Sequence, residues 1–233
     1  MDIALFSTDG IAFLLRWIHF LAGVMWIGIL WYFNMVQGSW FAEADASTKT
    51  AALAKLVPRA LWWFRWGAMF TWLSGFSLLL LYTHQFGMDY FSTSRGITIL
   101  TGALMGTYMF LNVWLIIWPN QKVVIASAQS VLSGGQADPA AAACGAKAGL
   151  ASRHNTLFSI PLLFMMGASS HLAIQTNADS KICGYYLTAG IIITLIEFNG
   201  IKGKNGPIAS VSGVIHFGLA LAAILYVLLE FLL

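Results

Sequence analysis

The sequence predicts an all-α integral membrane protein, built as a bundle of six transmembrane helices. Hydrophobic residues make up 59% of its 233 positions and charged residues only 9%, and the mean hydropathy is +0.77. A soluble chain of this length could not cover its surface with so few polar groups. Ten Trp, seven Tyr and 16 Phe are typical of a membrane protein with aromatic side chains at both interfaces. The net charge of +3 gives no reason to expect a nucleic-acid partner, so we expect membrane lipid around the chain.

The first three spans are apolar stretches close to the roughly 20 residues that a helix needs to cross a bilayer. We expect them at residues 17–36, 62–82 and 96–118. Arg16 directly precedes the first span and is expected to mark the outer interface. Pro119 directly follows the third span and is expected to end its helix, because proline has no backbone N–H to donate.

The last three spans are expected at residues 157–174, 184–198 and 208–231. The fourth follows a polar run in which Asn155 or the next residue could cap the start of its helix. The fifth is the shortest and carries Glu197 near its end. No internal repeat or separate soluble domain is apparent, so residues 1–233 are interpreted as a single bundle.

The distribution of Lys and Arg predicts the orientation of the bundle, because cytoplasmic loops are enriched in positive charge. With the N-terminus outside, only Arg16, Arg95 and Lys181 lie on the outer side. The inner side then holds the remaining basic residues: Lys49, Lys55, Arg59, Arg65, Lys122, Lys147, Arg153, Lys202 and Lys204. We therefore expect a multi-pass protein of the bacterial inner membrane with both termini in the periplasm. Its main cytoplasmic loop covers about residues 119–155, where two Ala-rich stretches could form short helices.

Two histidines predict a cofactor site, because an imidazole inside a membrane is costly unless it has a function. Gly23 lies four residues after His19, and Gly167 lies four residues before His171. The first and fourth spans run in opposite directions, so both glycines lie deeper than their histidines. Each glycine is expected to leave an empty patch beside its ring. The pair could ligate the iron of one heme b from both sides, with Arg16 at the outer rim close to a heme propionate.

The other three histidines leave a second heme open. His216 lies in the inner half of the sixth span, between small residues, and could ligate a second heme iron or line a substrate cavity. His154 is its nearest partner by depth, although their levels differ by several ångströms. His84 lies just past the second span and is interpreted as an interfacial residue, with replacement of either His19 or His171 as a ligand left open.

Polar residues at the inner ends of the third and fourth spans predict a substrate site. Asn120 follows the third span, and Arg153, His154 and Asn155 precede the fourth. Helix capping is the simpler explanation for part of this set. An arginine, a histidine and two amides also suit a flat, anionic, hydrogen-bonding molecule, such as a purine like urate.

Several motifs resemble the membrane domain of the cytochrome-c-linked urate hydroxylase family. They are Arg16-Trp17-Ile18-His19-Phe20-Leu21-Ala22-Gly23, Trp26-Ile27-Gly28, Trp72-Leu73-Ser74-Gly75-Phe76, Asn112-Val113-Trp114, Trp118-Pro119-Asn120-Gln121 and Arg153-His154-Asn155-Thr156. The resemblance implies an integral membrane protein that oxidises urate and passes electrons to a c-type cytochrome. Full-length members of that family carry a C-terminal cytochrome c domain. This chain ends at Leu233 without a Cys-x-x-Cys-His motif, so we expect a separate c-type cytochrome or a larger membrane complex as its partner.

Two other function classes stay open from the sequence alone. A non-catalytic heme-binding subunit for electron transfer would share the histidines but would not oxidise urate. A transporter or metal-handling protein would need acidic residues deep in its helices. Only Glu197 and Glu230 come close to that position, both near the ends of expected spans, so this class is the least favoured.

Overall fold

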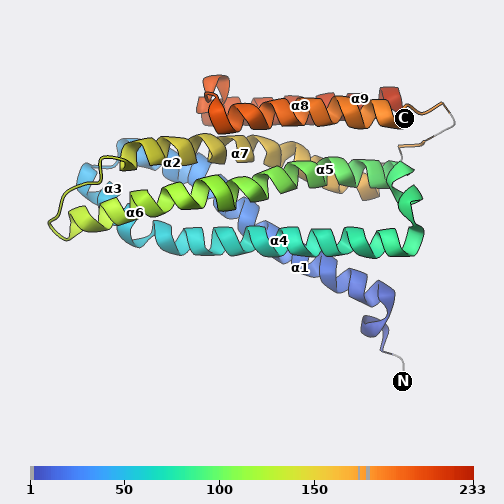
Figure 1. Ribbon diagram of the computed structural model, residues 1–233, viewed down its shortest axis with the longest axis horizontal. Coiled ribbons are helices and arrows are strands. Elements are labelled where there is room, and N and C mark those ends of the chain that lie inside the picture. The colour runs from blue at the N-terminus through green and yellow to red at the C-terminus, as the bar shows by residue number, and fades with distance from the viewer. Residues whose placement is uncertain (1–2, 173, 177–178) are drawn as a thin grey trace.

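The computed structural model describes residues 3–172, 174–176 and 179–233, and within these residues the chain is helical with no β-strand (Figure 1). Its long helices are α1 (Thr8–Trp31), α4 (Val57–Phe86), α5 (Ser94–Leu111), α7 (Ala141–His171), α8 (Ile182–Lys202) and α9 (Val211–Leu232). Shorter α-helices are α2 (Gly38–Glu43), α3 (Ala46–Lys55) and α6 (Trp118–Leu132). Single turns of 3-10 helix form η1 (Ala4–Phe6), η3 (Met88–Ser92) and η5 (Gly206–Ala209), and π-helix forms η2 (Tyr32–Gln37) and η4 (Asn112–Ile117).

Five helical stretches within the described residues are long and apolar enough to cross a membrane. They are Thr8–Glu43, Val57–Phe86, Ser94–Leu132, Ile182–Lys202 and Val211–Leu232. They correspond to five of the six expected spans. The remaining span, the fourth in chain order, was expected at residues 157–174 and falls mostly in α7, which is not apolar enough to count among these stretches. Residue 173 of this span lies outside the described residues.

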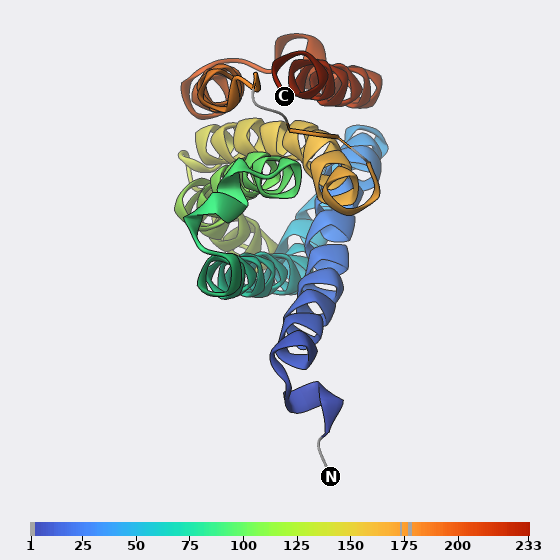
Figure 2. The same cartoon turned by 90° about the vertical axis from the view of Figure 1, so that its right-hand side faces the viewer.

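Helix α7 is less apolar because it lies at the centre of the molecule. It packs against α5, α6, α8 and α9, and its inner half also contacts the π-helical segment η4. Figure 2 shows α8 and α9 as a separate layer on one side of α7, with the α1 and α4 pair on the far side. Buried polar side chains of α7 include His154, Asn155, Thr156 and Ser159. A helix enclosed by other helices can carry such residues because neighbours, rather than lipid, satisfy them.

Glycines let the helices approach one another closely, as is common in membrane bundles. A Cβ at Gly67 of α4 would lie 3.1 Å from the backbone nitrogen of Trp26 in α1. A Cβ at Gly218 of α9 would lie 2.5 Å from Ile160 Cδ1 in α7. These contacts bring α1 against α4 and α9 against α7, which fixes the two outer layers on the central helices.

Pro119 does not end its helix, contrary to the prediction. α5, η4 and α6 form one continuous helical stretch, and Pro119 lies in the first turn of α6 directly after the π-helical segment. The hydrogen-bond register changes there, so the missing N–H of proline falls where the regular ladder is already interrupted. The prediction that Asn155 or Thr156 caps a helix is also wrong. α7 already begins at Ala141, and both side chains lie in its buried interior. The expected loop therefore narrows to residues 133–140.

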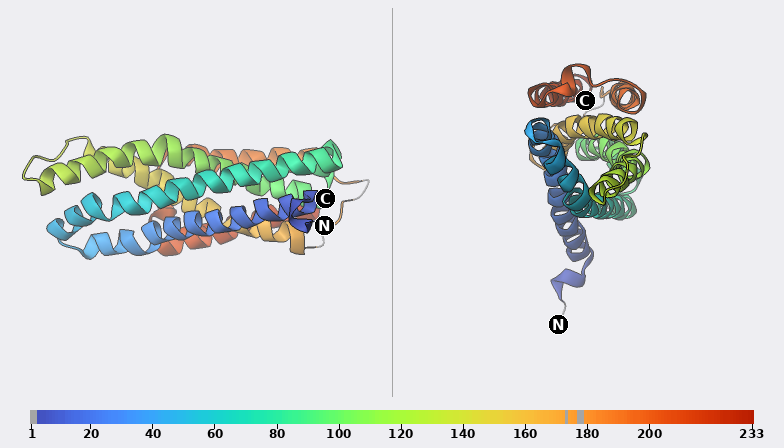
Figure 3. Two further views of the ribbon diagram at one scale, coloured as in Figure 1. Left: turned by 90° about the horizontal axis from the view of Figure 1, so that it is seen from below. Right: turned by 90° about the vertical axis from the view of Figure 1, so that its left-hand side faces the viewer.

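Both ends of the chain lie at the same end of the bundle (Figures 1 and 3). The α4–α5 connection and the α7–α8 connection are at this end as well. α3 and the connection between α6 and α7, which belong to the expected basic side, lie at the opposite end. The fold thus separates the segments in the way that the charge distribution predicts.

Candidate functional site

His19 projects from α1 onto α4 and is partly buried there. Its Nδ1 lies 2.9 Å from the carbonyl oxygen of Thr71 and 3.3 Å from Ser74 Oγ. A carbonyl can only accept a hydrogen bond, so Nδ1 carries the proton and donates it. Nε2 then holds a lone pair, and it has no hydrogen bond among the described residues. A metal-ligating histidine usually has this arrangement, because the bond at one nitrogen fixes the ring for the other.

Two glycines accompany His19, but not as the sequence suggested. A Cβ at Gly75 of α4 would lie 2.9 Å from His19 Cε1, so the ring occupies the space that this glycine leaves free. A Cβ at Gly23 would lie 3.8 Å from Thr71 Cγ2. This is ordinary van der Waals distance, so Thr71 borders the space beside Gly23, and the predicted empty patch there stays a prediction. Gly75, not Gly23, makes room for the imidazole.

An unsatisfied donor lies further along the same face of α1. Trp26 is seven residues after His19, two helical turns away, and only 2% of its surface is exposed. Its indole N–H is buried without a partner among the described residues. His19 Nε2 and the Trp26 indole N–H are thus one acceptor and one donor without a partner among the described residues.

His171 is the last residue of α7 and is exposed. Gly167, one turn before it, is also exposed, and a Cβ added there would meet nothing within 4 Å. Space for a flat group is thus present beside His171. The structure records no hydrogen bond between His171 and His19 in its described part, and their shared ligation of one iron stays a prediction.

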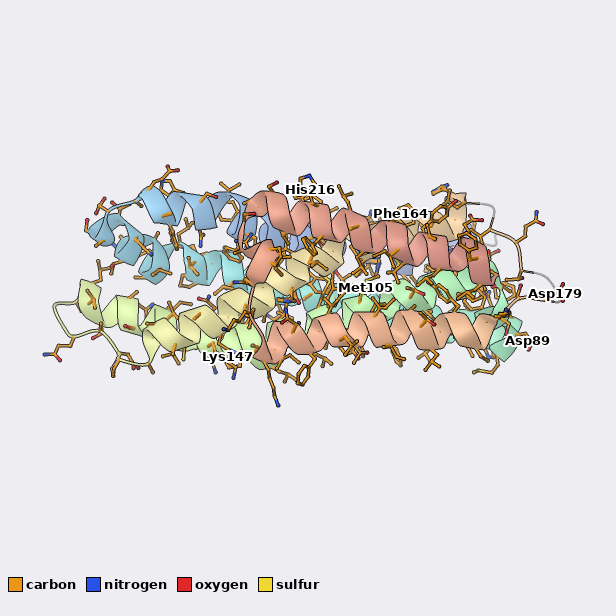
Figure 4. The ribbon with its side chains drawn as sticks, turned by 90° about the horizontal axis from the view of Figure 1, so that it is seen from above. Asp89, Met105, Lys147, Phe164, Asp179 and His216 are labelled. Atoms are coloured by element: carbon orange, nitrogen blue, oxygen red, sulfur yellow. The ribbon has the colours of Figure 1, made fainter. Side chains whose placement is uncertain are left out.

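Two further histidines, His84 and His216, are exposed. His216 of α9 lies at the edge of the molecule (Figure 4), with Nδ1 2.7 Å from the carbonyl oxygen of Ser212. Its Nε2 is also open, so it keeps the geometry of a ligand for a group bound against α9. His84 is exposed near the end of α4.

His154 is committed to the protein at both ring nitrogens. It is 1% exposed, and its Nδ1 lies 3.0 Å from the carbonyl oxygen of Leu150. Asn199 of α8 donates its side-chain N–H to Nε2 over 2.8 Å. A Cβ at Gly200 would lie 2.9 Å from His154 Cγ, so α8 is in direct contact with the ring. This geometry ties α7 to α8 and leaves no nitrogen for a metal or a substrate.

Asn155 belongs to a buried polar network that joins α5, α7 and α8. Its side-chain oxygen accepts a hydrogen bond of 2.8 Å from Asn112 in η4, and its side-chain nitrogen donates to the carbonyl oxygen of Met109. Asn112 also donates to Glu197 Oε2 over 3.1 Å. Glu197 is 5% exposed and lies inside α8, not at a helix end as the sequence suggested. A carboxyl group is thus enclosed in the bundle with two asparagines.

Arg153 lies beside the other π-helical segment. Its guanidinium donates to the carbonyl oxygen of Asn34 in η2 over 3.2 Å, and the Asn34 side chain donates to Ser152 Oγ over 2.8 Å. Each π-helical segment therefore places one asparagine against the same stretch of α7. Such segments often occur at functional sites, because they turn side chains and backbone groups away from the regular ladder. Asn120 acts locally, donating to the carbonyl oxygen of Ile116 over 2.7 Å.

Aromatic and unpartnered polar groups surround this inner region. The Arg65 guanidinium lies 3.5 Å from the centre of the Trp118 ring and 5.6 Å from that of Trp114. Three buried side-chain atoms in or just after the π-helical segments have no partner among the described residues: Gln37 Oε1, Trp114 Nε1 and Gln121 Oε1. Flat aromatic rings together with free donors and acceptors are what a flat heterocyclic anion requires.

Comparison with protein families identifies the chain. A family described as "Urate oxidase N-terminal" matches residues 81–225, which is more than half of the sequence. The chain belongs to this family. No curated protein and no solved structure matches it.

The urate oxidase N-terminal match contains the network of Asn112, Asn155 and Glu197 and also includes Arg153. It begins in the last part of α4, after His19 and its contacts. Sequence reasoning missed Asn34 and the position of Glu197. A lone carboxylate within an apolar stretch was the available signal for Glu197, whereas a π-helical turn has no signature that would have pointed to Asn34.

Two apolar grooves on this family member do not border the polar residues. One, with a volume of about 460 Å³, is lined only by residues of α1, among them Trp17, Val24 and Gly28. The other is lined only by residues of α8, among them Leu187 and Gly190. Grooves of this kind suit lipid acyl chains, so the candidate chemistry lies at the helix interfaces described above.

Proposed function

We propose that this urate oxidase family member is a heme-b oxidoreductase of the bacterial inner membrane that oxidises urate and delivers the electrons to a periplasmic c-type cytochrome. The family match supports urate as the substrate, and the geometry of His19 supports the cofactor. In this proposal α7 supplies the fourth of six spans, and both termini face the periplasm. The single observation that carries the cofactor is an imidazole fixed through Nδ1 to α4 with its Nε2 open.

The outer half of the protein holds and orients the cofactor. When bound, a b-type heme supplies one-electron redox chemistry between the substrate and the cytochrome. His19 would hold the heme iron through Nε2, and the Thr71 carbonyl keeps its ring in one orientation. His171 is proposed as the second residue that would hold the iron, because the space beside Gly167 is open. His216 keeps the ligand geometry that a second heme on α9 requires.

The inner half is proposed to bind urate. Arg153 provides positive charge, and the free atoms of Gln37, Trp114 and Gln121 provide hydrogen bonds to ring N–H and carbonyl groups. Hydroxylation of urate by water releases two electrons and two protons, and two molecules of oxidised cytochrome c account for the electrons. His154, Asn155 and Asn120 shape this end by joining helices, rather than by contacting the substrate.

The decisive experiment is the reduced-minus-oxidised absorption spectrum of the purified full chain. We expect a b-type signal that is lost in His19→Ala and in His171→Ala. His84→Ala should keep the signal, since His84 is an exposed imidazole near the end of α4 and lies outside the proposed pair; loss of the signal there would make His84 a ligand in place of His19 or His171. A protein that shows no b-type signal, or keeps it in both variants, contradicts the proposed cofactor site.

A second function is favoured by one observation: the polar side chains at the inner end of the bundle form hydrogen bonds with one another and with other protein groups. His154, Asn155 and Glu197 bond to protein groups, as a purely structural core would. The chain would then be a non-catalytic electron-transfer subunit of a larger complex. Purified protein mixed with urate and soluble cytochrome c separates the two functions. Urate-dependent reduction of the cytochrome supports the enzyme, and a heme spectrum without turnover supports the subunit.

A further inference from the structure

A group of arginine and tyrosine residues gathers where α1, α4 and α5 meet, at the end that holds both termini. Arg16 of α1 donates to the Tyr82 hydroxyl from Nε over 3.1 Å and also from Nη2. The Arg95 guanidinium of α5 lies 5.5 Å from the centre of the same Tyr82 ring. Tyr90 of η3 stands beside it, with the two tyrosine ring centres 5.4 Å apart. Two cations therefore share one tyrosine at the outer end of the bundle.

No carboxylate neutralises these cations within the described part of the chain. Neither Arg16 nor Arg95 forms an ion pair there, and their interactions are those with the tyrosines. Asp89, the acidic residue next to Tyr90, is exposed at the tip of the bundle (Figure 4). Two guanidinium groups on one tyrosine thus leave positive charge there without a counter-charge, and an anion bound near both would neutralise it.

Tyr90 supplies a second, independent observation. It is 6% exposed, and its hydroxyl is buried without a hydrogen-bond partner among the described residues. Burial raises the pKa of Tyr90 above its usual value, against an opposing effect of Arg95 and Arg16, whose charges act on the hydroxyl. The hydroxyl is therefore protonated at neutral pH and can donate a hydrogen bond. A buried donor without a partner is unfavourable, and a bound acceptor would satisfy it.

We propose that Arg16, Arg95 and the Tyr90 hydroxyl form an anion-binding site for the propionate groups of the heme. The inference rests on the heme site of the proposed function. Arg16 lies three residues before His19 and so nearly one turn further out on the same face of α1. On α4, Tyr82 lies seven residues beyond Gly75, again on the same face. A flat group bound at His19 thus has its acidic edge directed to this site.

The site is specific for a carboxylate or phosphate, for chemical reasons. Arginine pairs with both through parallel N–H bonds, and a tyrosine hydroxyl donates to an anionic oxygen. Within a membrane, the phosphate of an anionic phospholipid is the other source of this chemistry. Proximity to His19 favours the propionates, and the experiment below separates the two sources.

The test is the midpoint potential of the b-type heme in the purified full chain. We expect Arg95→Gln and Tyr90→Phe to shift it to lower potential, because each loses a group that offsets the negative charge of a propionate and so favours the reduced iron. Lys181→Gln is the matched control: it removes an exposed positive charge at the same end of the bundle and should leave the potential unchanged. Since Tyr90→Phe removes only one oxygen atom, folding is not at issue.

Three results overturn the inference and can be told apart. A heme that keeps its wild-type potential in both variants contradicts the propionate site but leaves the proposed heme function in place. Loss of a thermal stabilisation by phosphatidylglycerol vesicles over phosphatidylcholine vesicles in Arg95→Gln, with the potential unchanged, assigns the site to a phospholipid phosphate. A wild-type protein without heme removes both the propionate site and the proposed function.

Discussion

Gly75 decides where the imidazole of His19 can lie, although it belongs to another helix. Sequence reasoning found His19 because a histidine in an apolar span is unusual, but it assigned the space beside the ring to Gly23. The packing of α1 on α4 determines which glycine faces the ring, and that packing cannot be read from one helix alone. A Cβ at position 75 would lie 2.9 Å from Cε1 and 3.2 Å from Nδ1 of His19.

Gly75→Ala is therefore expected to turn the ring and weaken its hydrogen bond to Thr71 without unfolding the bundle. The imidazole can move because it is the end of a side chain, whereas its iron ligation depends on its orientation. We expect a weakened or shifted b-type absorption spectrum with wild-type helix content by circular dichroism. Gly28→Ala is the control, since a Cβ there meets nothing within 4 Å. A wild-type spectrum in Gly75→Ala would contradict the assigned role.

Among the elements, the length of the helices was predicted less well than their existence. The first three expected spans lie within helical stretches Thr8–Glu43, Val57–Phe86 and Ser94–Leu132, each much longer than predicted. Hydropathy ends a span at the first polar residues, but backbone hydrogen bonding continues beyond the apolar core. The π-helical segments η2 and η4 join what would otherwise be separate helices.

The network of Asn112, Asn155 and Glu197 shows what the π-helical segment does for the bundle. Asn112→Leu removes the donor to Glu197 and the donor to Asn155 at once. We expect the free energy of unfolding to fall by about 1–3 kcal/mol, because the buried carboxyl group of Glu197 loses its hydrogen-bond partner among the described residues. Chemical denaturation in detergent micelles measures this change.

The double variant Asn112→Leu/Glu197→Leu tests the cause. It should be more stable than Asn112→Leu alone, because no carboxyl group then remains buried without a partner. Ser77→Ala serves as the control, since Ser77 is partly buried and, among the described residues, its hydroxyl donates to the carbonyl oxygen of Leu73 in its own helix. If Asn112→Leu were no less stable than Ser77→Ala, the network would have no part in holding α5 to α8.

For the whole molecule, composition was enough to predict an all-helical membrane bundle, and the structure confirms the helical class and five apolar helices of membrane length. The central position of α7 was not predictable in the same way. Its polar residues, such as His154 and Asn155, lower its hydropathy and led to the prediction of a substrate site at the inner end of the helix. Only the packing of α8 and α5 around α7 shows that these side chains bond to protein.

The orientation of the bundle can be tested with its own two cysteines. Cys183 is exposed at the start of α8, near both termini, and Cys144 lies at the opposite end, in the first turn of α7. With the basic end in the cytoplasm, a membrane-impermeant maleimide should label Cys183 in spheroplasts and not label the opposite end. Because Cys144 is only partly exposed, Gln136→Cys in a Cys183→Ser background provides an accessible reporter there. That reporter should react only after the membrane is permeabilised, and labelling of position 136 in intact spheroplasts would reverse the proposed topology.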